Sequence, residues 1–383
     1  MMFDLHEERE AWALDPTVHH CNHGSFGAVP SVVREIQRAV QDQVQQNPVR
    51  FFAREAQDRV AAARARIAAF LGQQPEQIAL VRNATEAAST TLRGFPFQQG
   101  DEAIILDQEY GAVVYAVQRA LASAGGVLRE VAIPLDDDAA HIVARVEAAI
   151  NSHTRLLVVD HITSATARIL PVQQLADVCR AHGIAIAVDA SHAPGQLDLD
   201  LDRLDADFWF GNLHKWVCAP LGSAVYRVAP RWKTRMRPLI VSWRDAEDYP
   251  APWDMLGTVD VSAWLTAPAA IDFFAHLGWE RVRAANQERM RYGRELVLAA
   301  LGLSKDILPP DAIAMGLVPL PALQGGRAAC AALQKRLAEV YRVETAITTC
   351  AGAYYLRVCG QLYNKAQDYQ ALASAIRTEL RGC

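Results

Sequence analysis

From about residue 76 the sequence alternates short apolar runs with longer amphipathic stretches, and this alternation narrows the possible folds. The apolar runs predict strands at 78–81, 103–107, 156–160, 184–189, 207–211 and 223–228. Helical spacing is found between them at 85–94, 110–125 and 171–183. Nearly continuous apolar strands separated by helices are typical of a parallel sheet covered on both faces. The sequence therefore predicts an α/β fold with a largely parallel sheet.

The pattern changes near residue 262, where a long helical stretch, 262–302, leads into a segment that mixes strands and helices. A chain of 383 residues is long enough for two or three domains. We expect an N-terminal arm at 1–20, a large domain at 21–262 and a smaller α+β domain at 263–383.

Charge and hydropathy give no reason to expect a nucleic-acid or membrane partner. The net charge is −5, and neither a block of basic residues nor an apolar run of membrane-spanning length occurs. The acidic N-terminus lacks the apolar core of a signal peptide, and the seven cysteines form no CxxC pair. We expect a cytoplasmic protein with reduced thiols and, because its histidines are dispersed, without a metal site.

Lys215 lies within an unusually apolar, aromatic run, DFWFGNLHKWVCAPLG at 207–222. Apolar surroundings disfavour the charged form of a lysine, so its amine can become a neutral nucleophile. The alternative interpretation is a lysine whose stem packs along an aromatic core while its amine reaches water.

Polar side chains follow three of the predicted strands. Asp189 ends one strand, His161 follows another, and Lys215 comes shortly after a third. Ligands of parallel α/β sheets gather at the carboxyl ends of the strands. A carboxylate and a lysine at neighbouring strand ends suit pyridoxal phosphate (PLP), because the carboxylate keeps the pyridine nitrogen protonated and the lysine forms a Schiff base.

A phosphate group also needs a binding site, and the stretch RNATEAAST at 82–90 offers one. It follows a predicted strand and opens a helix, with Thr85 near the first turn. Backbone N–H groups at a helix N-terminus and one hydroxyl can bind an anion. The same residues are also ordinary helix caps.

Several segments, taken in order, resemble the class V aminotransferases, and most of all the isopenicillin N epimerase-like proteins. They are 22–30, 47–55, 83–87, 107–114, 160–172, 188–228, 257–273 and 356–368. The resemblance implies a PLP-dependent enzyme of fold type I, with a mainly parallel seven-stranded sheet between helices and a smaller α+β domain. It also implies an amino-acid substrate and a homodimer with active sites at the subunit interface.

The resemblance assigns four catalytic residues around the cofactor ring. Lys215 matches the Schiff-base lysine and Asp189 the partner of the pyridine nitrogen. His192 occupies the place of the group that binds the ring hydroxyl, and Tyr110 that of the aromatic side chain stacked on the ring. Tyr110 would also fit an ordinary core position, and His192 an ordinary turn.

Further cofactor contacts follow from the same resemblance. Ala84 and Thr85 match the phosphate-binding turn, and His214 is another candidate for the phosphate. Thr258 resembles the residue that reaches the phosphate from the partner subunit. Ser164 stands beside the ring, where many family members have asparagine.

The substrate is expected to meet a different set of residues. Arg357 matches the arginine that binds a substrate α-carboxylate through two hydrogen bonds. Asn22, His23 and Ser25 lie in an N-terminal loop that the family folds near the substrate. Arg50 either faces the active site or braces a helix, and a loop such as 22–25 is equally compatible with a simple turn.

PLP weakens every bond at Cα, so the protein decides the reaction. Epimerisation needs an acid on the face opposite Lys215, for which Tyr110, His23 and a bound water are all open. β-Elimination, including C–S cleavage of a cysteine conjugate or sulfoxide, needs only one base. We expect an epimerase or racemase first, a C–S lyase second and an aminotransferase third.

Two other functions fit the sequence poorly. Desulfurases of this class carry a nucleophilic cysteine on a loop well upstream of the carboxylate-binding arginine. Here Cys350 lies close to Arg357 in a predicted strand, and Cys330 lies in a helical run, so both resemble small buried hydrophobic residues. A non-catalytic PLP-binding regulator would normally carry a DNA-binding domain, for which we find no room.

Overall fold

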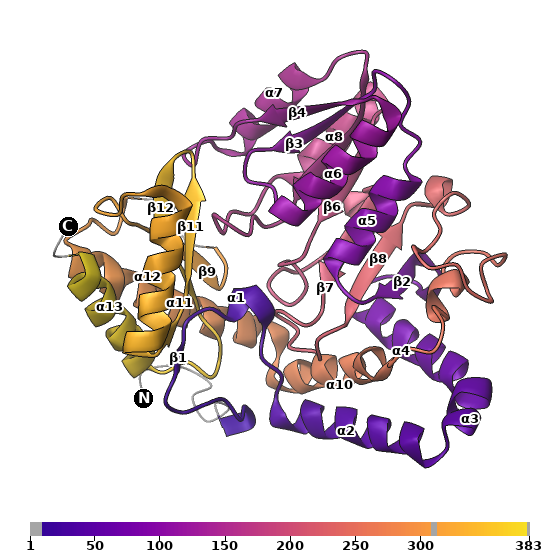
Figure 1. The fold of residues 1–383 in the computed structure, drawn as a ribbon, viewed down its shortest axis with the longest axis horizontal. Coiled ribbons are helices and arrows are strands. Elements are labelled where there is room, and N and C mark those ends of the chain that lie inside the picture. Colours follow the sequence, from indigo (N-terminus) through magenta and orange to yellow (C-terminus); the bar gives the residue numbers. More distant parts are fainter. Residues whose placement is uncertain (1–9, 308–311, 381–383) are drawn as a thin grey trace.

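The computed structural model describes residues 10–307 and 312–380, and its largest element is a seven-stranded sheet (Figure 1). In spatial order the strands are β2 (Ile78–Val81), β8 (Ala224–Val228), β7 (Phe208–Asn212), β6 (Ala185–Asp189), β5 (Thr154–Asp160), β3 (Glu102–Leu106) and β4 (Val127–Val131). β8 runs in the direction opposite to the other six strands of this sheet. The predicted α/β class and the largely parallel sheet are confirmed.

The six predicted strands agree with the observed ones to within two residues at either end. The sequence analysis missed β4, which lies at one edge of the sheet. Its residues Val127, Arg129 and Glu130 are exposed, so the strand has no continuous apolar run. An edge strand buries less of its surface than an inner strand, and the apolar signal is correspondingly weak.

Helices cover both faces of the sheet, and alternate strand residues feed the two cores. In β5, Leu157 and Val159 join the core packed by α4, α7, α8 and α10, while Leu156 and Val158 join the core packed by α5 and α6. These helices are α4 (Ala56–Phe70), α5 (Ala84–Gly94), α6 (Gly111–Ala124), α7 (Ala139–Ala149), α8 (Val172–His182) and α10 (Ser262–Leu277). Burial on both faces explains why the inner strands are apolar throughout.

The N-terminal segment forms β1 (His19–His20), α1 (His23–Phe26), α2 (Ser31–Gln46) and α3 (Pro48–Arg50). A short helix, α9 (Leu201–Leu204), lies between β6 and β7. β1 pairs in parallel with β10 (Val343–Glu344), so the segment lies against the C-terminal part of the chain.

The C-terminal part has a three-stranded antiparallel sheet and a hydrophobic core of its own. Its elements are α11 (Trp279–Leu301), β9 (Met315–Pro319), α12 (Gly326–Tyr341), β11 (Ala346–Cys350), β12 (Ala353–Cys359) and α13 (Ala366–Leu380). The predicted long helical stretch is two helices, α10 and α11, separated at Gly278, which has a φ of +85°. The domain limits stay predictions, and residues 1–9 of the expected arm lie outside the described residues.

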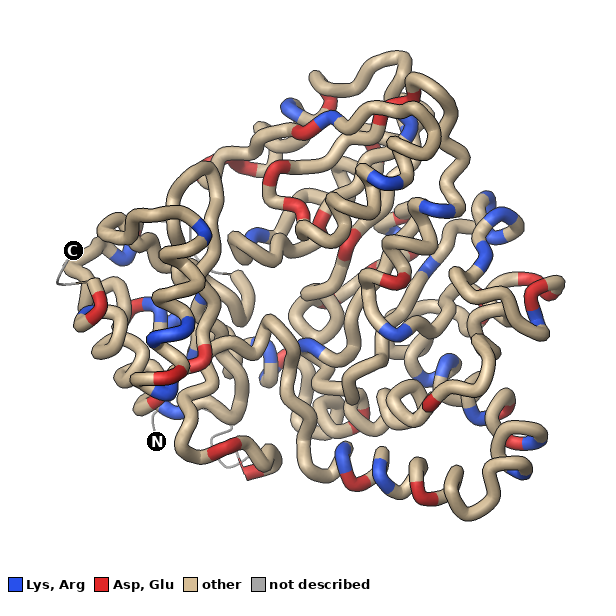
Figure 2. Tube along the Cα trace, in the orientation of Figure 1, with Lys and Arg blue, Asp and Glu red and all other residues tan. Residues whose placement is uncertain are grey.

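Lys and Arg are interspersed with Asp and Glu along the chain (Figure 2). This distribution over the described residues agrees with the mild net charge of −5. Among the described helices, none combines the length and apolar character that crossing a bilayer requires.

Gly293 tests the packing of α11 on α13, because a Cβ atom at this position would overlap the buried ring of Tyr369. We expect Gly293→Ala to lower the free energy of unfolding by about 1–3 kcal/mol. Gly111→Ala is the control, since a Cβ there meets no atom within 4 Å. Thermal unfolding of both variants measures the difference, and equal stability would contradict this packing.

Candidate active site

The carboxyl ends of β5, β6 and β7 open into a pocket of about 330 Å³. Eight of the predicted site residues line it: Ser25, Thr85, Tyr110, Ser164, Asp189, His192, His214 and Lys215. They come from segments far apart in the sequence, and the parallel strands bring them to one edge of the sheet. The pocket therefore lies where an α/β sheet usually binds its ligand.

Lys215 is half-buried, and its Nζ lies 3.0 Å from Nε2 of His192. Burial lowers the pKa of Lys215 from 10.5 to about 8, although the charges of Asp189 and Asp160 act in the opposite direction. A larger fraction of this amine is therefore neutral near pH 7 than for an ordinary surface lysine.

The hydrogen bonds of His192 are consistent with a neutral lysine. Burial, followed by the nearby charge of Lys215, holds the pKa of His192 well below its usual value. The indole Nε1–H of Trp216 donates to Nδ1 of His192 at 3.3 Å, which leaves the imidazole proton on Nε2. That N–H can donate to Lys215 Nζ only when the amine has a free lone pair.

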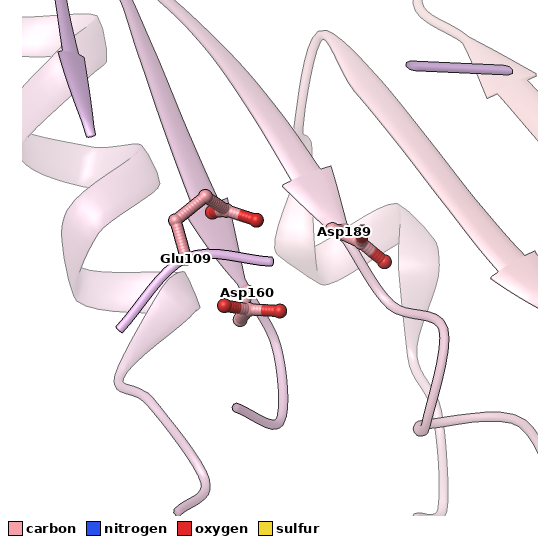
Figure 3. A group of neighbouring side chains, drawn as sticks. All are labelled: Glu109, Asp160 and Asp189. Atoms are coloured by element: carbon pink, nitrogen blue, oxygen red, sulfur yellow. The ribbon is translucent and has the colours of Figure 1, made fainter. Parts of the chain in front are cut away.

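Three buried carboxyl groups lie close together (Figure 3), and two of them, Asp160 and Asp189, line the pocket. Glu109, Asp160 and Asp189 each place a carboxyl oxygen within 4.8 Å of the others, and Asp160 and Asp189 are register partners on β5 and β6. Burial raises the pKa of all three, and the charge of Asp189 raises the pKa of Glu109 and Asp160 further. Like charges so close together cannot all ionise.

Asp189 has the contacts that best stabilise an ionised carboxylate. Its Oδ1 accepts hydrogen bonds from the backbone N–H of Ser191 at 2.8 Å and from the Ser191 hydroxyl at 2.5 Å. Glu109 Oε1 accepts from the N–H of Tyr110, whereas the buried Oε2 has no hydrogen-bond partner. We infer that Asp189 carries the charge and that Glu109 and Asp160 share the remaining protons.

The start of α5, where the sequence predicts an anion site, lies at the pocket, and the anion site stays a prediction. Asn83 caps the helix by accepting from the N–H of Glu86 at 2.9 Å. Thr85 lines the pocket, whereas Ala84 is buried and donates its N–H to Oδ1 of Asn212 at 2.9 Å. His214 lines the pocket with a buried Nδ1 that has no partner. A helix N-terminus with these donors suits a phosphate.

Arg357 is buried behind the pocket wall on β12. Its Nη1 donates to the carbonyl of Ser164 at 2.6 Å, and its Nη2 donates to Asn22 Oδ1 and Ser25 Oγ, both at 2.9 Å. Ser164 and Ser25 line the pocket, so two of the hydrogen-bond partners of Arg357 belong to the pocket wall. These partner oxygens are neutral, and a carboxylate would be a stronger acceptor for the same donors.

Six predicted residues do not line the pocket of their own chain. Asn22, Ala84 and Arg357 contact residues of its wall, and the other three lie elsewhere. Arg50 is exposed on α3 and pairs with Glu55 at 2.9 Å. Thr258 is exposed and does not line the pocket, so its expected contact with the partner's phosphate stays a prediction. His23 is buried and contacts the backbone of Lys215 instead of lining the pocket.

The sequence analysis assigned no role to several residues that build the site, namely Arg82, Asn83, Glu109, Asp160, Ser191 and Asn212. Asp160 had a usable signal, because it ends an apolar strand just as Asp189 does. Glu109 had none, since its contact with Asp189 depends on the order of strands in the sheet. Buried carboxylates at this spacing can also bind a metal ion, so the expected lack of a metal stays a prediction.

The residues present fit PLP. Asp189, whose carboxylate accepts two hydrogen bonds from Ser191, suits a protonated pyridine nitrogen. The amine of Lys215, with its lowered pKa, suits the aldehyde, and the start of α5 with His214 suits the phosphate. Tyr110 lines the pocket with a side chain that is 49% exposed, and an aromatic ring could cover it by stacking.

Glu109→Gln tests the acidic group without the cofactor. An acid with a raised pKa costs the folded state progressively more stability as pH rises above its unfolded value. We therefore expect the variant of the cofactor-free protein to gain stability over wild type as pH rises from about 5 to about 8. Thermal unfolding across this range measures the gain, with the exposed Glu130→Gln on β4 as control. A gain that is independent of pH would contradict the shared protons.

Comparison with known proteins adds independent information. The family described as aminotransferase class-V matches residues 24–306. Isopenicillin N epimerase of Streptomyces clavuligerus is 32% identical, with 97% of this chain and 98% of that protein covered. A probable chloroplastic L-cysteine desulfhydrase of Arabidopsis thaliana is 28% identical, with 96% and 84% covered.

A solved structure shows the same fold. It is the cystine C–S lyase C-DES in complex with its reaction product cysteine persulfide, with a TM-score of 0.80, 21% identity, and 94% of this chain and 98% of that chain covered. The chain belongs to the class V aminotransferase family and is a PLP-dependent enzyme of fold type I.

Proposed function

We propose that this enzyme removes the Cα proton of an amino-acid substrate and cleaves its Cβ–S bond, and so acts as a C–S lyase. The observation that carries the proposal is the amine of Lys215, whose pKa burial lowers to about 8 at the end of a pocket suited to PLP. An amine of this pKa is well matched to proton transfer near neutral pH.

When bound, PLP would withdraw electrons from Cα and so make its proton acidic. We propose that Asp189 holds the ring nitrogen, His192 the ring hydroxyl, and Thr85 with His214 the phosphate. Arg357 would orient the substrate carboxylate, exchanging its contacts with Ser25 and Asn22 for two charge-assisted hydrogen bonds. Lys215 would then take the Cα proton, and a thiol would leave from Cβ.

The position of His23 favours elimination over epimerisation. An epimerase needs an acid on the face of Cα opposite Lys215, and the sequence left Tyr110, His23 and water as candidates. His23 uses both ring nitrogens in contacts behind the pocket wall, which leaves Tyr110 as the side-chain candidate of that set. Elimination from a cysteine derivative needs Lys215 alone, with pyruvate, ammonia and a thiol as products after hydrolysis.

Epimerisation is the second candidate, and the half-exposed Tyr110 is the observation that favours it. The resemblance stacks Tyr110 on one face of the cofactor ring, and its hydroxyl would have to protonate Cα from that face. The 32% identity to an isopenicillin N epimerase supports the same alternative. Transamination remains third, because no observed contact favours it.

Both cysteines considered for desulfuration are buried away from the pocket. Cys350 ends β11 and Cys330 lies within α12. Burial raises the pKa of each thiol, which lowers the fraction of reactive thiolate. Their positions support cleavage of a C–S bond by elimination rather than by a cysteine nucleophile.

We also propose a cytoplasmic homodimer with its active sites at the subunit interface. Phe26 and Leu221 line the pocket, yet their side chains are 74% and 66% exposed. Large apolar side chains at a pocket rim are natural contacts for a second subunit. Such a partner would also supply Thr258 to the neighbouring phosphate.

Incubation with cysteine conjugates in deuterated water separates the reactions. We expect pyruvate and a thiol in equal amounts from the wild type, because Lys215 suffices as the base. Lys215→Ala should lose this activity, whereas Tyr110→Phe should still form product and serves as the matched variant. Chiral analysis and mass spectrometry follow the unreacted substrate. Deuterated substrate of inverted configuration without pyruvate, lost in Tyr110→Phe, would replace the lyase with an epimerase.

A further inference from the structure

His23 lies on the far side of the Lys215 backbone from the pocket, in a buried polar cluster with Cys218, Gln361 and Tyr363. We propose that His23 is a positioning residue, which fixes the Lys215 main chain and thereby aims the amine into the pocket. This inference rests on the proposed attachment of PLP to Lys215, and it replaces the expected role of His23 in binding substrate.

The contacts of His23 define which ring nitrogen carries the proton. Nε2 lies 2.9 Å from the carbonyl oxygen of Lys215, which can only accept, so Nε2 must donate. Nδ1 is then an acceptor, and the hydroxyl of Tyr363 donates to it at 3.0 Å. Tyr363 therefore selects the tautomer that His23 needs to hold Lys215.

Gln361 is the remaining member of the cluster, and its amide group is a donor that does not accept the Nε2 proton of His23. Its amide nitrogen lies 3.2 Å from Nε2 of His23 and 3.6 Å from Sγ of Cys218. Since Nε2 already carries a proton, the amide donates to the sulfur.

His23 stays neutral over the range in which such enzymes work. It is 2% exposed, and burial lowers its pKa from 6.5 to about 4, against the opposing effect of its bond to Lys215. The same tautomer and the same hydrogen bond therefore persist well below neutral pH. A group that neither titrates nor lines the pocket is suited to hold a backbone in place and unsuited to transfer the Cα proton.

The turn that follows Lys215 needs this support. Cys218 has a φ of +55°, a left-handed conformation that is unfavourable for a residue with a side chain. The carbonyl of Lys215 accepts from the N–H of Cys218 at 3.1 Å as well as from His23. Gly27, from the same N-terminal loop as His23, passes so close that a Cβ atom would overlap the carbonyl of His214.

The same loop also contacts Arg357 through Asn22 and Ser25. One short segment, 22–27, therefore contacts both the Lys215 backbone and the Arg357 guanidinium and fixes their relative position. Fixing both groups before the substrate arrives reduces the entropy that is lost when they are oriented for the reaction.

A matched pair of substitutions tests the proposal. The amide nitrogen of His23→Gln reaches about as far as Nε2 and retains the donor to Lys215, whereas that of His23→Asn reaches only the position of Nδ1. We expect His23→Asn to slow covalent attachment of PLP to Lys215 by about tenfold, the effect of one hydrogen bond, and His23→Gln by less than about twofold. Absorbance during reconstitution measures the rates, and thermal unfolding of the cofactor-free proteins reports any general loss of stability.

Steady-state kinetics provide a second readout. Because Arg357 keeps its contacts, His23→Asn should lower kcat and leave KM for the substrate within about twofold of wild type. Attachment by His23→Asn at the wild-type rate, or by His23→Gln as slowly as by His23→Asn, would overturn the proposal. A wild type that attaches no PLP at Lys215 would instead overturn the proposed function on which it rests.

Tyr363→Phe keeps the test decisive if His23→Asn does not fold. It removes the donor to Nδ1 but leaves the ring, so attachment should slow by at least about twofold. Tyr226→Phe is the control, because Tyr226 is also a buried tyrosine and its hydroxyl contacts Thr91 in the sheet core. Equal rates in the two variants would overturn the role of the His23 tautomer.

Discussion

Lys215 Nζ lies 3.0 Å from His192 Nε2, and burial lowers the pKa of this amine from 10.5 to about 8. Apolar surroundings alone would not orient the amine. The strand ends orient it toward the pocket, because Asp189 on β6 and the turn after β7 face the same pocket. The reactivity of Lys215 therefore depends on how the sheet desolvates this side chain while holding its backbone.

Burial shifts the pKa of the three acids at the pocket upward, opposite to its effect on Lys215. It raises the pKa of Glu109, Asp160 and Asp189, and only Asp189 has two donors from Ser191 to stabilise its charge. Asp189 is therefore the acid of the three best suited to meet a cationic ring nitrogen. A pocket that lowers the pKa of one amine and stabilises the charge of one carboxylate is prepared for PLP before the cofactor enters.

Local sequence predicted most of the large sheet, because its inner strands are buried on both faces and their apolar runs are continuous. It missed β4, whose exposed residues lack that pattern. The motifs around Lys215, Asp189 and Tyr110 located the pocket, since they lie at strand ends or helix starts. His23 and Glu109 could not be placed in this way. Their contacts, with Tyr363 and Asp189, join residues that are distant in the sequence.

Family membership and reaction type rest on different evidence. The family follows from a match over most of the chain, whereas relatives at about 30% identity include both an epimerase and a desulfhydrase. Within one fold, the groups around Cα decide the outcome. Here the position of His23 behind the lysine backbone removes one candidate acid from the pocket, whereas Tyr110 lines the pocket and keeps epimerisation open.

The most direct test of this account is the pH dependence of PLP attachment to Lys215. Cofactor-free protein would be mixed with PLP over a range of pH, reduced with borohydride and analysed by peptide mass. Attachment requires the neutral amine, so its rate should rise with pH around a midpoint near 8. Labelling at other lysines, or a midpoint near the ordinary value of 10.5, would contradict a desolvated Lys215 as the basis of the site.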